Sequence, residues 1–275
     1  MKSYTETVIQ PGKSIAGYWR DLWCYRELLF FLSWRDILVR YKQTIIGILW
    51  SILRPILTML VFTFVFAKVA GLSSGNTPYP ILVFSAMLPW QFFATSLTEC
   101  SNSLIENANM VSKIYFPRLI VPISSIVVSI VDFFISFAVL ILLMIYYGYT
   151  PSVRIVMIPI FLVLAITSSL GPGILLASLN VKYRDFRYVI PFLVQFGLFV
   201  SPVGFSSAAV PEHWRPLYYL NPLVGVIDGF RWTIIRETAF PSSSWFLLSL
   251  AVNIGLFFVG IAYFRRTERM LADVI

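Results

Sequence analysis

The chain has 275 residues, of which 58% are hydrophobic and 12% are charged, and its mean hydropathy is +0.80. Soluble domains carry about twice this share of charged residues, so the composition excludes a water-soluble globular protein and indicates a polytopic membrane protein. The net charge of +8 does not indicate a nucleic-acid partner, because the basic residues lie in the gaps between apolar segments, where membrane topology places them.

The segment before the first apolar run is basic and amphipathic. On a helical projection its large apolar side chains share one arc: Phe30, Trp34, Ile37, Leu38, Tyr41 and Ile45. Most of the opposite arc is charged, and these residues are Arg35, Asp36, Arg40 and Lys42. Such a helix lies on an anionic membrane surface, with its aromatic rings dipping in and its cations facing the head groups. We therefore predict that residues 1–46 form a cytoplasmic tail ending in an interface helix.

Six apolar segments of membrane length follow, which predicts an all-α integral membrane domain over residues 47–264. The predicted spans are residues 47–68, 79–98, 119–147, 154–179, 188–209 and 244–264. An even number of spans puts both chain ends on one side. Most lysines and arginines lie in the N-terminal segment, in the loops after the second and fourth spans, and in the tail, residues 265–275. Because positive residues are retained in the cytoplasm, we predict that both ends are cytoplasmic.

Two charged residues fall inside predicted spans. Asp132 lies near the middle of the third span, and a carboxylate in hydrocarbon is costly, so it is expected to face a helix interface or a wet cavity. Two roles are open for Arg54, just inside the first span: it pairs with Asp132, or it reaches back to the cytoplasmic surface. Two lone charges do not make a proton relay.

Both predicted inner loops have features beyond those of a simple connector. Residues 102–122 predict a short cytoplasmic helix that ends before Pro117, and such a helix either docks into a partner's groove or merely joins two spans. Residues 179–191 combine several cations with Asp185. A positive-inside anchor explains the cations but not the aspartate, and a docking contact with a cytosolic protein is the alternative.

The outer segment, residues 206–243, is too apolar for a solvated loop and too charged to cross the membrane. Its apolar residues make one helical face: Leu223, Val226, Ile227, Phe230 and Ile234. Its charges interrupt any continuous span: Asp228, Arg231 and Arg236. We predict a re-entrant or interface-lying helix pair at the outer mouth of a pathway, with an amphipathic cap on the bilayer as the alternative. Asn221 followed by Pro222 predicts the helix start.

Motifs for chemistry are missing from the sequence. It has no phosphate-binding loop of the G-x-x-x-x-G-K-[ST] type, no His/Cys cluster for a metal and no Ser-His-Asp set, and its single histidine is His213. A transporter without its own energy source must borrow one, so we expect the inner loops to dock a cytosolic motor. The alternatives are a membrane-embedded glycosyl or acyl transferase, which would need convergent acidic residues or histidines, and a passive channel.

Five stretches, in this order, resemble the permease subunits of ABC-2 type polysaccharide exporters, which export O-antigen, capsule or teichoic acid. They are RDILVRYKQTIIGILWSILRP (residues 35–55), NANMVSKIYFPRLIVP (107–122), NVKYRDFRYVIPF (180–192), SPVGF (201–205) and NPLVGVIDGFRW (221–232). The resemblance implies a homodimer in the bacterial inner membrane that exports a lipid-linked polysaccharide. It also implies a separate ABC ATPase subunit, which binds the ATP and magnesium, so that no cofactor is expected on this chain.

The resemblance also implies roles for individual residues. Coupling to the ATPase falls to Asn107, Val111, Lys113, Tyr115, Tyr183, Arg184 and Asp185. The interface helix, residues 35–45 with Trp34 before it, contributes Trp34, Arg35, Asp36, Arg40 and Tyr41. The outer gating helices, residues 211–235, contribute Asn221, Pro222, Asp228, Arg231 and Trp232.

Aromatic residues make up 17% of the chain, and sugar C–H faces stack on aromatic rings. Trp90, Phe93 and Phe199 are therefore possible channel residues, although many aromatics in spans face lipid or form interfacial belts. The function predicted from all of this is ATP-driven export of an O-antigen-like glycan. Export of teichoic acid, drugs or lipids by the same architecture is the nearest rival.

Overall fold

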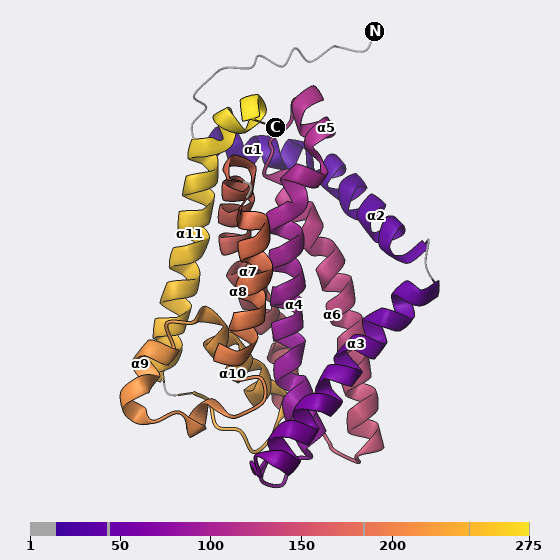
Figure 1. Ribbon diagram of the computed structural model, residues 1–275, viewed down its shortest axis with the longest axis vertical. Coiled ribbons are helices and arrows are strands. Elements are labelled where there is room, and N and C mark those ends of the chain that lie inside the picture. The colour runs from indigo at the N-terminus through magenta and orange to yellow at the C-terminus, as the bar shows by residue number, and fades with distance from the viewer. Residues whose placement is uncertain (1–14, 43–44, 184, 242, 275) are drawn as a thin grey trace.

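All regular structure in the described part of the chain is helical, which confirms the predicted all-α class. The computed structural model describes residues 15–42, 45–183, 185–241 and 243–274 (Figure 1). Five helical segments are long and apolar enough to cross a membrane: Leu49–Val69, Tyr79–Glu106, Ile120–Tyr146, Val153–Lys182 and Ser244–Glu268. The protein is therefore a multi-pass membrane protein.

The five segments correspond to predicted spans and are built from long helices with local irregularities. They are α3 (Ile45–Thr63) with the π-helix η1 (Phe64–Val69), α4 (Tyr79–Glu106), α6 (Ile120–Tyr146), the 3₁₀-helix η2 (Val153–Met157) with α7 (Ile158–Lys182), and α11 (Ser243–Val274). Helix α11 continues through most of the predicted tail, because nothing in residues 265–274 breaks a helix.

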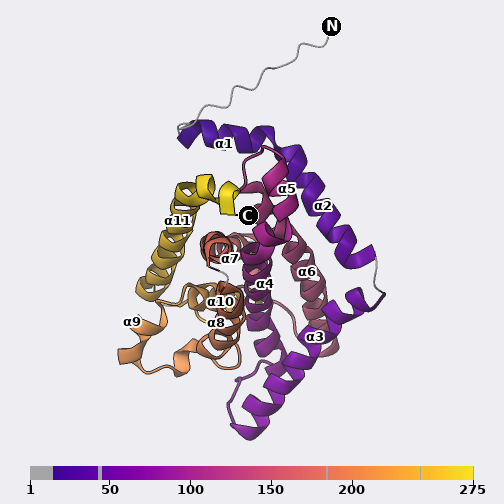
Figure 2. The same ribbon diagram turned by 45° about the horizontal axis from the view of Figure 1, so that its top comes forward.

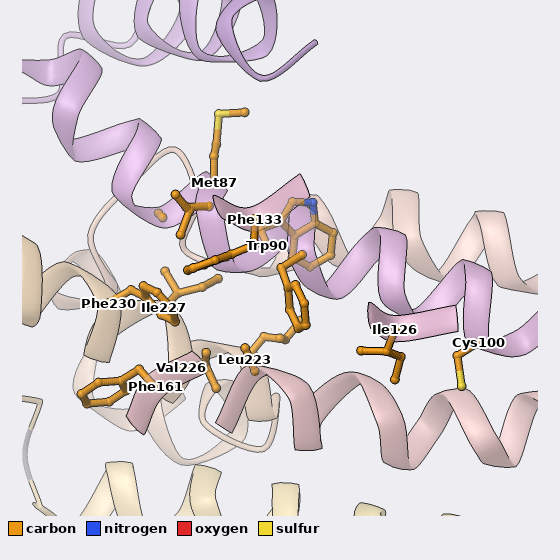
Figure 3. Close-up of a cluster of buried hydrophobic side chains, with 14 of the residues drawn as sticks. Met87, Trp90, Cys100, Ile126, Phe133, Phe161, Leu223, Val226, Ile227 and Phe230 are labelled. Carbon is orange, nitrogen blue, oxygen red and sulfur yellow. The ribbon is translucent and has the colours of Figure 1, made fainter. Parts of the chain in front are cut away.

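Helix α4 is the centre of the bundle, with α6, α7 and α3 around it (Figures 1 and 2). In the most apolar window of α4, 67% of the residues are buried, against 11% in the corresponding window of α3. Trp90 of α4, Phe133 of α6 and Phe230 of α10 belong to one buried cluster (Figure 3). The rings of Phe133 and Phe230 meet edge to face at 5.8 Å. Helix α3 is therefore the outermost of the long helices, and most of its surface faces outward.

The predicted fifth span is wrong in its second half. Helix α8 (Phe186–Val200) has 15 residues, about 22 Å of helix, which is short of the roughly 30 Å hydrocarbon core. It ends because Ser201 precedes Pro202 and takes an extended conformation, with φ −92° and ψ 151°. The segment after Val200 bends and then forms the short 3₁₀-helix η3 (Ser207–Ala209) instead of continuing as a span.

Helix α10 of the outer segment folds into the protein, so the alternative of an amphipathic cap on the bilayer is wrong for this helix. After the 3₁₀-helix η4 (Glu212–Trp214) and the short helix α9 (Arg215–Tyr218) comes α10 (Pro222–Ile234), which packs against α4, α7 and α11. Nearly every residue of α10 is buried, the charged ones included. The predicted helix start is confirmed, since the Asn221 side chain accepts from the Leu223 backbone N–H at 3.1 Å and Pro222 is the first helical residue.

Two helices precede the first span: α1 (Ile15–Cys24) and α2 (Arg26–Lys42). Helix α2 runs obliquely beside α6 (Figures 1 and 2), and Leu32 and Ser33 are its buried contacts. Phe30 and Trp34 lie on the opposite side, exposed and stacked on each other with ring centroids 6.5 Å apart. The interface helix is thus longer than predicted at its N-terminal end, and it rests on α6 through residues that the amphipathic pattern did not select.

Helix α1, the short helix α5 (Ala108–Lys113) and the C-terminal end of α11 gather at one end of the molecule (Figure 1). Glu268 joins three segments there. It accepts from the Tyr18 hydroxyl at 3.3 Å and from the Arg118 backbone N–H at 3.1 Å. Burial, and then the nearby carboxylate, raise the pKa of Tyr18, so its hydroxyl keeps the proton that it donates. Helix α1 and the end of α11 therefore lie together, and the side of the membrane on which they lie stays a prediction.

Helices α7 and α11 cross at two glycines, where a side chain has no room. A Cβ on Gly260 would lie 2.1 Å from the Gly171 carbonyl oxygen, and a Cβ on Gly171 would lie 2.6 Å from the Phe257 Cα. Small residues that let two backbones approach are typical of helix crossings in membranes. We expect Gly260→Val to lower the free energy of unfolding by about 1–3 kcal/mol, because the two helices must separate.

Gly255 is the matched control for this crossing, because it lies on the same helix and a Cβ there meets nothing within 4 Å. Gly255→Val should change the thermal midpoint of the purified protein little, and Gly260→Val should lower it clearly. Equal midpoints for the two variants would contradict the close crossing.

Candidate functional site

A groove with polar and apolar lining residues opens between α3, α4, α6 and α8. Its volume is about 490 Å³. Its polar lining residues are Arg40, Ser51, Arg54, Thr58, Gln91, Thr95, Thr98, Asp132, Ser136 and Gln195. The remaining lining is apolar and includes Trp50 and Trp90. The groove therefore offers both hydrogen-bonding groups and aromatic surface.

The three aromatic residues proposed for a channel are in different environments. Trp90 lines the groove, with 4% of its surface exposed, and the ring of Phe93 lies 5.7 Å from the Trp90 ring. Phe199 is 68% exposed on α8, and it is not part of the groove lining. The structure brings the first two together, and their role in a channel stays a prediction.

Sequence reasoning missed several groove residues, including Trp50, Gln91 and Gln195. A signal was present for part of this set. Gln91, Thr95 and Thr98 are spaced by four and three residues, which places them on one face of α4. A polar stripe along an otherwise apolar membrane helix indicates a face turned toward a cavity.

Asp132 is held by residues from α2 and α3. Its carboxylate pairs with the Arg40 guanidinium at 3.0 Å, accepts from the Ser51 hydroxyl at 3.3 Å and also accepts from the Tyr41 hydroxyl. Arg40 makes a second, longer ion pair with Glu99 of α4 at 3.4 Å. The charged partner of Asp132 is therefore Arg40 of the interface helix and not Arg54, which lines the same groove.

The interface helix also contacts the segment predicted to couple to an ATPase. Arg35 pairs with its neighbour Asp36 at 2.7 Å and donates to the Asn107 side chain at 2.8 Å. Asn107 is the residue before α5, and its amide donates to the Ser103 carbonyl at 2.9 Å. These bonds fix the start of α5 against α2. Asn107 therefore links the start of α5 to the interface helix.

The other predicted coupling residues differ in accessibility. Val111 is buried, whereas Lys113 and Tyr115 are exposed just after it. Tyr183 and Asp185, between α7 and α8, are also exposed. Arg184 lies outside the described residues.

The turn between α7 and α8 is anchored to α4 at the end of the bundle that carries α5. The Asn180 amide donates to the Ser101 carbonyl at 3.2 Å and to the Asn102 side chain at 3.1 Å. The two inner segments predicted to dock a partner therefore belong to one end of the bundle, joined through α4.

At the opposite end of the bundle, α10 carries the predicted gate residues. Asp228 and Arg231 are 5% and 3% exposed. Arg231 donates to the Phe205 carbonyl at 2.6 Å and to the Val203 carbonyl at 3.0 Å, and the Tyr79 hydroxyl donates to the Gly204 carbonyl at 2.8 Å. Three successive carbonyls of the non-helical segment after α8 thus receive hydrogen bonds from α10 and α4, which satisfies backbone that would otherwise lack partners.

Asp228 is satisfied by a neighbouring phenol. The Tyr219 hydroxyl donates to Asp228 at 2.8 Å. Burial, and then the adjacent carboxylate, raise the pKa of Tyr219, which keeps this hydroxyl protonated. Trp232, another predicted gate residue, is half-buried with the Arg154 guanidinium 4.9 Å above its ring. A polar cavity of about 510 Å³, lined partly by Asp228 and Arg231, opens beside them.

The described residues contain no group of three or more His, Cys, Asp or Glu side chains placed to bind a metal ion. The structure thus has a groove within the bundle, the buried contacts of Arg231 and Tyr79 at one end of the bundle, and the partly exposed helix α5 at the other end.

Comparison with known proteins identifies this arrangement. Residues 27–235 match the family described as ABC-2 type transporter, from α2 to the residue after α10. The chain is 28% identical over 258 residues to the O-antigen export system permease protein RfbA of Myxococcus xanthus, covering 93% of this chain and 98% of that protein. It is 27% identical over 250 residues to a protein of the same name from Klebsiella pneumoniae, with 90% and 95% covered. The resemblance seen in the five sequence stretches is thereby confirmed, and the chain belongs to the ABC-2 type transporter family as a permease.

Proposed function

We propose that this chain is the membrane subunit of an ATP-driven exporter that moves a lipid-linked, O-antigen-like polysaccharide across a bacterial inner membrane. The observation that carries the proposal is the end-to-end likeness to permeases named for O-antigen export, which covers 93% of this chain and 98% of one relative. ATP hydrolysis, and the magnesium that it needs, belong to a separate ABC ATPase subunit.

The groove chemistry suits a glycan. Sugar rings present C–H faces that stack on aromatic surface, and their hydroxyls exchange hydrogen bonds with amide and hydroxyl side chains. Trp50 and Trp90 supply the first kind of surface, and Thr58, Thr95 and Thr98 supply hydroxyl groups. A homodimer would place two such grooves around one passage, with α3 and α8, the exposed helices of the groove, facing the partner copy.

The orientation in the membrane follows from the same proposal. Both chain ends and α5 lie on the cytoplasmic side, and exposed Lys113, Tyr115, Tyr183 and Asp185 meet the ATPase. Helices α9 and α10 form a re-entrant pair at the outer mouth, where the cavity beside Asp228 opens. In this arrangement α8 crosses only part of the bilayer, and the six-span count includes it as an incomplete span.

The test is complementation. A strain lacking this gene should lose surface glycan while its intracellular lipid-linked glycan accumulates, and export should return only when this chain and its ATPase are expressed together. Unchanged surface glycan in the deletion strain would overturn the proposal. Export restored by an ATPase variant without hydrolysis would instead indicate a passive channel.

Coupling gives a sharper prediction at Asn107. Asn107→Ala removes the hydrogen bond from Arg35 and should cost less than about 1 kcal/mol of stability, because the contact is partly exposed. Transport per ATP hydrolysed should nevertheless fall, about fivefold or more, because α5 is no longer fixed to the interface helix. ATPase activity and glycan export, measured together, would show this loss.

Asn109 provides the control for Asn107, because it is an exposed asparagine two residues further along, in α5. Asn109→Ala should leave the ratio of export to hydrolysis unchanged. If both variants export normally, the contact between α2 and α5 has no part in coupling.

A further inference from the structure

The groove contains one cation whose charge no neighbouring anion offsets. Its charged lining residues are Arg40, Arg54 and Asp132. Arg40 is paired with Asp132 at 3.0 Å and with Glu99 at 3.4 Å, so Arg54 is the charged lining residue without an ion-pair partner among the described residues. The Arg54 side chain makes no hydrogen bond or ion pair with any other residue that the structure describes. An unpaired arginine within a membrane-spanning helix is costly and marks a functional site by default.

The position of Arg54 along α3 matches the depth of a lipid head group. Trp50, Arg54 and Thr58 are four residues apart, so they share the face of α3 that lines the groove. Arg54 is five residues into the apolar segment that begins at Leu49, about 8 Å along the helix. In the proposed orientation this is the cytoplasmic end of the span, near the boundary between head groups and hydrocarbon.

Further donors converge on the same groove from the other side. Gln91 of α4 and Gln195 of α8 line it, and their side chains have no hydrogen-bond partner within the described residues. Each carboxamide offers two N–H donors, and a guanidinium offers five in a planar fork that matches phosphate oxygens. Two neutral amides and one unpaired guanidinium suit an anion with several oxygens better than they suit a neutral sugar.

Apolar walls complete the site. Met87 and Leu88 from α4, and Val194 and Leu198 from α8, line the groove beside these donors. A site that places a guanidinium fork beside apolar walls suits an amphiphile with an anionic head. A small anion dissolved in water would gain nothing from contact with the apolar walls.

We propose that Arg54, together with Gln91 and Gln195, binds the phosphate group of an anionic membrane amphiphile in this groove. The inference rests on the proposed function for its choice of cargo, since a phosphate-linked lipid carrier would enter the groove head first. Arg54 then recognises the phosphate that joins the lipid carrier to the glycan. Every cargo on that carrier shares this phosphate, so the glycan itself needs no specific contact.

The experiment measures equilibrium binding of radiolabelled farnesyl diphosphate, a short isoprenoid diphosphate, to the full-length protein in phosphatidylcholine nanodiscs. Arg54→Gln should raise the Kd at least tenfold, and Arg54→Lys, which keeps the charge without the fork, should fall between it and the wild type. Lys68→Gln is the matched control, because it removes one exposed cation from the far end of the same apolar segment and should change the Kd less than twofold.

Competition identifies the source of the phosphate. Displacement by unlabelled farnesyl diphosphate alone indicates a lipid carrier, and displacement also by phosphatidylglycerol indicates a bilayer lipid; both support the proposal. Equally effective displacement by inorganic phosphate would overturn it, as would wild-type binding by Arg54→Gln or an equal loss in Lys68→Gln. Thermal midpoints of the variants without ligand confirm that each is folded.

Failure of this inference can be told apart from failure of the proposed function. If Arg54→Gln binds and exports as the wild type does, the phosphate site is wrong and export of glycan stands. If the deletion strain displays normal glycan while the wild-type protein still binds farnesyl diphosphate through Arg54, the cargo is wrong and the phosphate site stands.

Discussion

Replacing Arg231 by methionine should leave little folded protein in the membrane. The guanidinium is 3% exposed and donates to the carbonyls of Phe205 and Val203 at 2.6 and 3.0 Å. Methionine fills a similar length but donates nothing, so both carbonyls lose a charged donor in a buried setting. Each loss costs about 1–3 kcal/mol, so we expect a destabilisation of about 3 kcal/mol or more.

The charge of Asp228 adds to this effect. Burial raises the pKa of Asp228, and Arg231 works against that rise by favouring the ionised carboxylate. Without Arg231 the carboxylate loses its nearby cation, and its pKa should rise further. A protonated Asp228 accepts a weaker hydrogen bond from the Tyr219 hydroxyl than a carboxylate does. The contact between the end of α9 and α10 is therefore weakened.

Expression level and the thermal midpoint of purified protein measure the result. Arg231→Lys should be intermediate, because one ammonium group cannot hold two carbonyls in a fixed fork. Arg236→Met serves as the control, because this arginine is exposed and its Nε donates to the Pro151 carbonyl at 3.2 Å. A midpoint for Arg231→Met no lower than that of the control would show that the carbonyls find other donors.

The buried contacts of Arg231 also show what could not be predicted from the sequence. The residue types of α10 correctly predicted a helix that begins at Asn221 and Pro222. Its charges were expected to interrupt a continuous span, and the structure buries Arg231 where the backbone after α8 supplies acceptors. Those acceptors exist only because Pro202 ends α8, and their position beside α10 is a tertiary contact that periodicity does not contain.

The long helices were easier to predict because their evidence is local. Apolar runs of membrane length placed α4, α6, α7 and α11 with boundaries mostly within a few residues, and Tyr79 was predicted as the first residue of its span. The end of α8 was missed although Pro202 signalled it, since the apolar run continues past that proline. At that position the apolar run favours a longer helix, whereas Pro202 disfavours a helical conformation for Ser201. The steric restriction by proline prevails.

The candidate site was predicted in parts but not as a whole. Asp132 and Trp90 were both selected, and the groove contains both. The partner of Asp132 was not found, because Arg40 belongs to a helix expected to lie on the membrane surface. The structure packs that helix against α6, and no sequence pattern reports a contact between residues so far apart in the chain.

This contact gives the second large prediction, in which Asp132→Ala frees the end of α2 from α6. The side chain of Asp132 is 16% exposed and accepts from Arg40, Tyr41 and Ser51. Its removal leaves one cation and two hydroxyls without this acceptor, so we expect a loss of about 2–3 kcal/mol in the free energy of unfolding. Hydrogen exchange of the α2 amides should become faster, and glycan export should be largely lost.

Glu99→Ala is the matched control for Asp132→Ala, because both carboxylates pair with Arg40. Its contact with Arg40 is longer, at 3.4 Å, and its side chain is 40% exposed, so Glu99→Ala should cost at most about 1 kcal/mol and leave α2 protected from exchange.

In the double variant Arg40→Ala/Asp132→Ala the two losses should overlap by about 0.5–3 kcal/mol, because both substitutions remove the same ion pair. Strict additivity, or equal exchange in the Glu99 and Asp132 variants, would mean that α2 is held by its apolar contacts alone. The polar cluster would then be a feature of the groove and not the attachment of the interface helix.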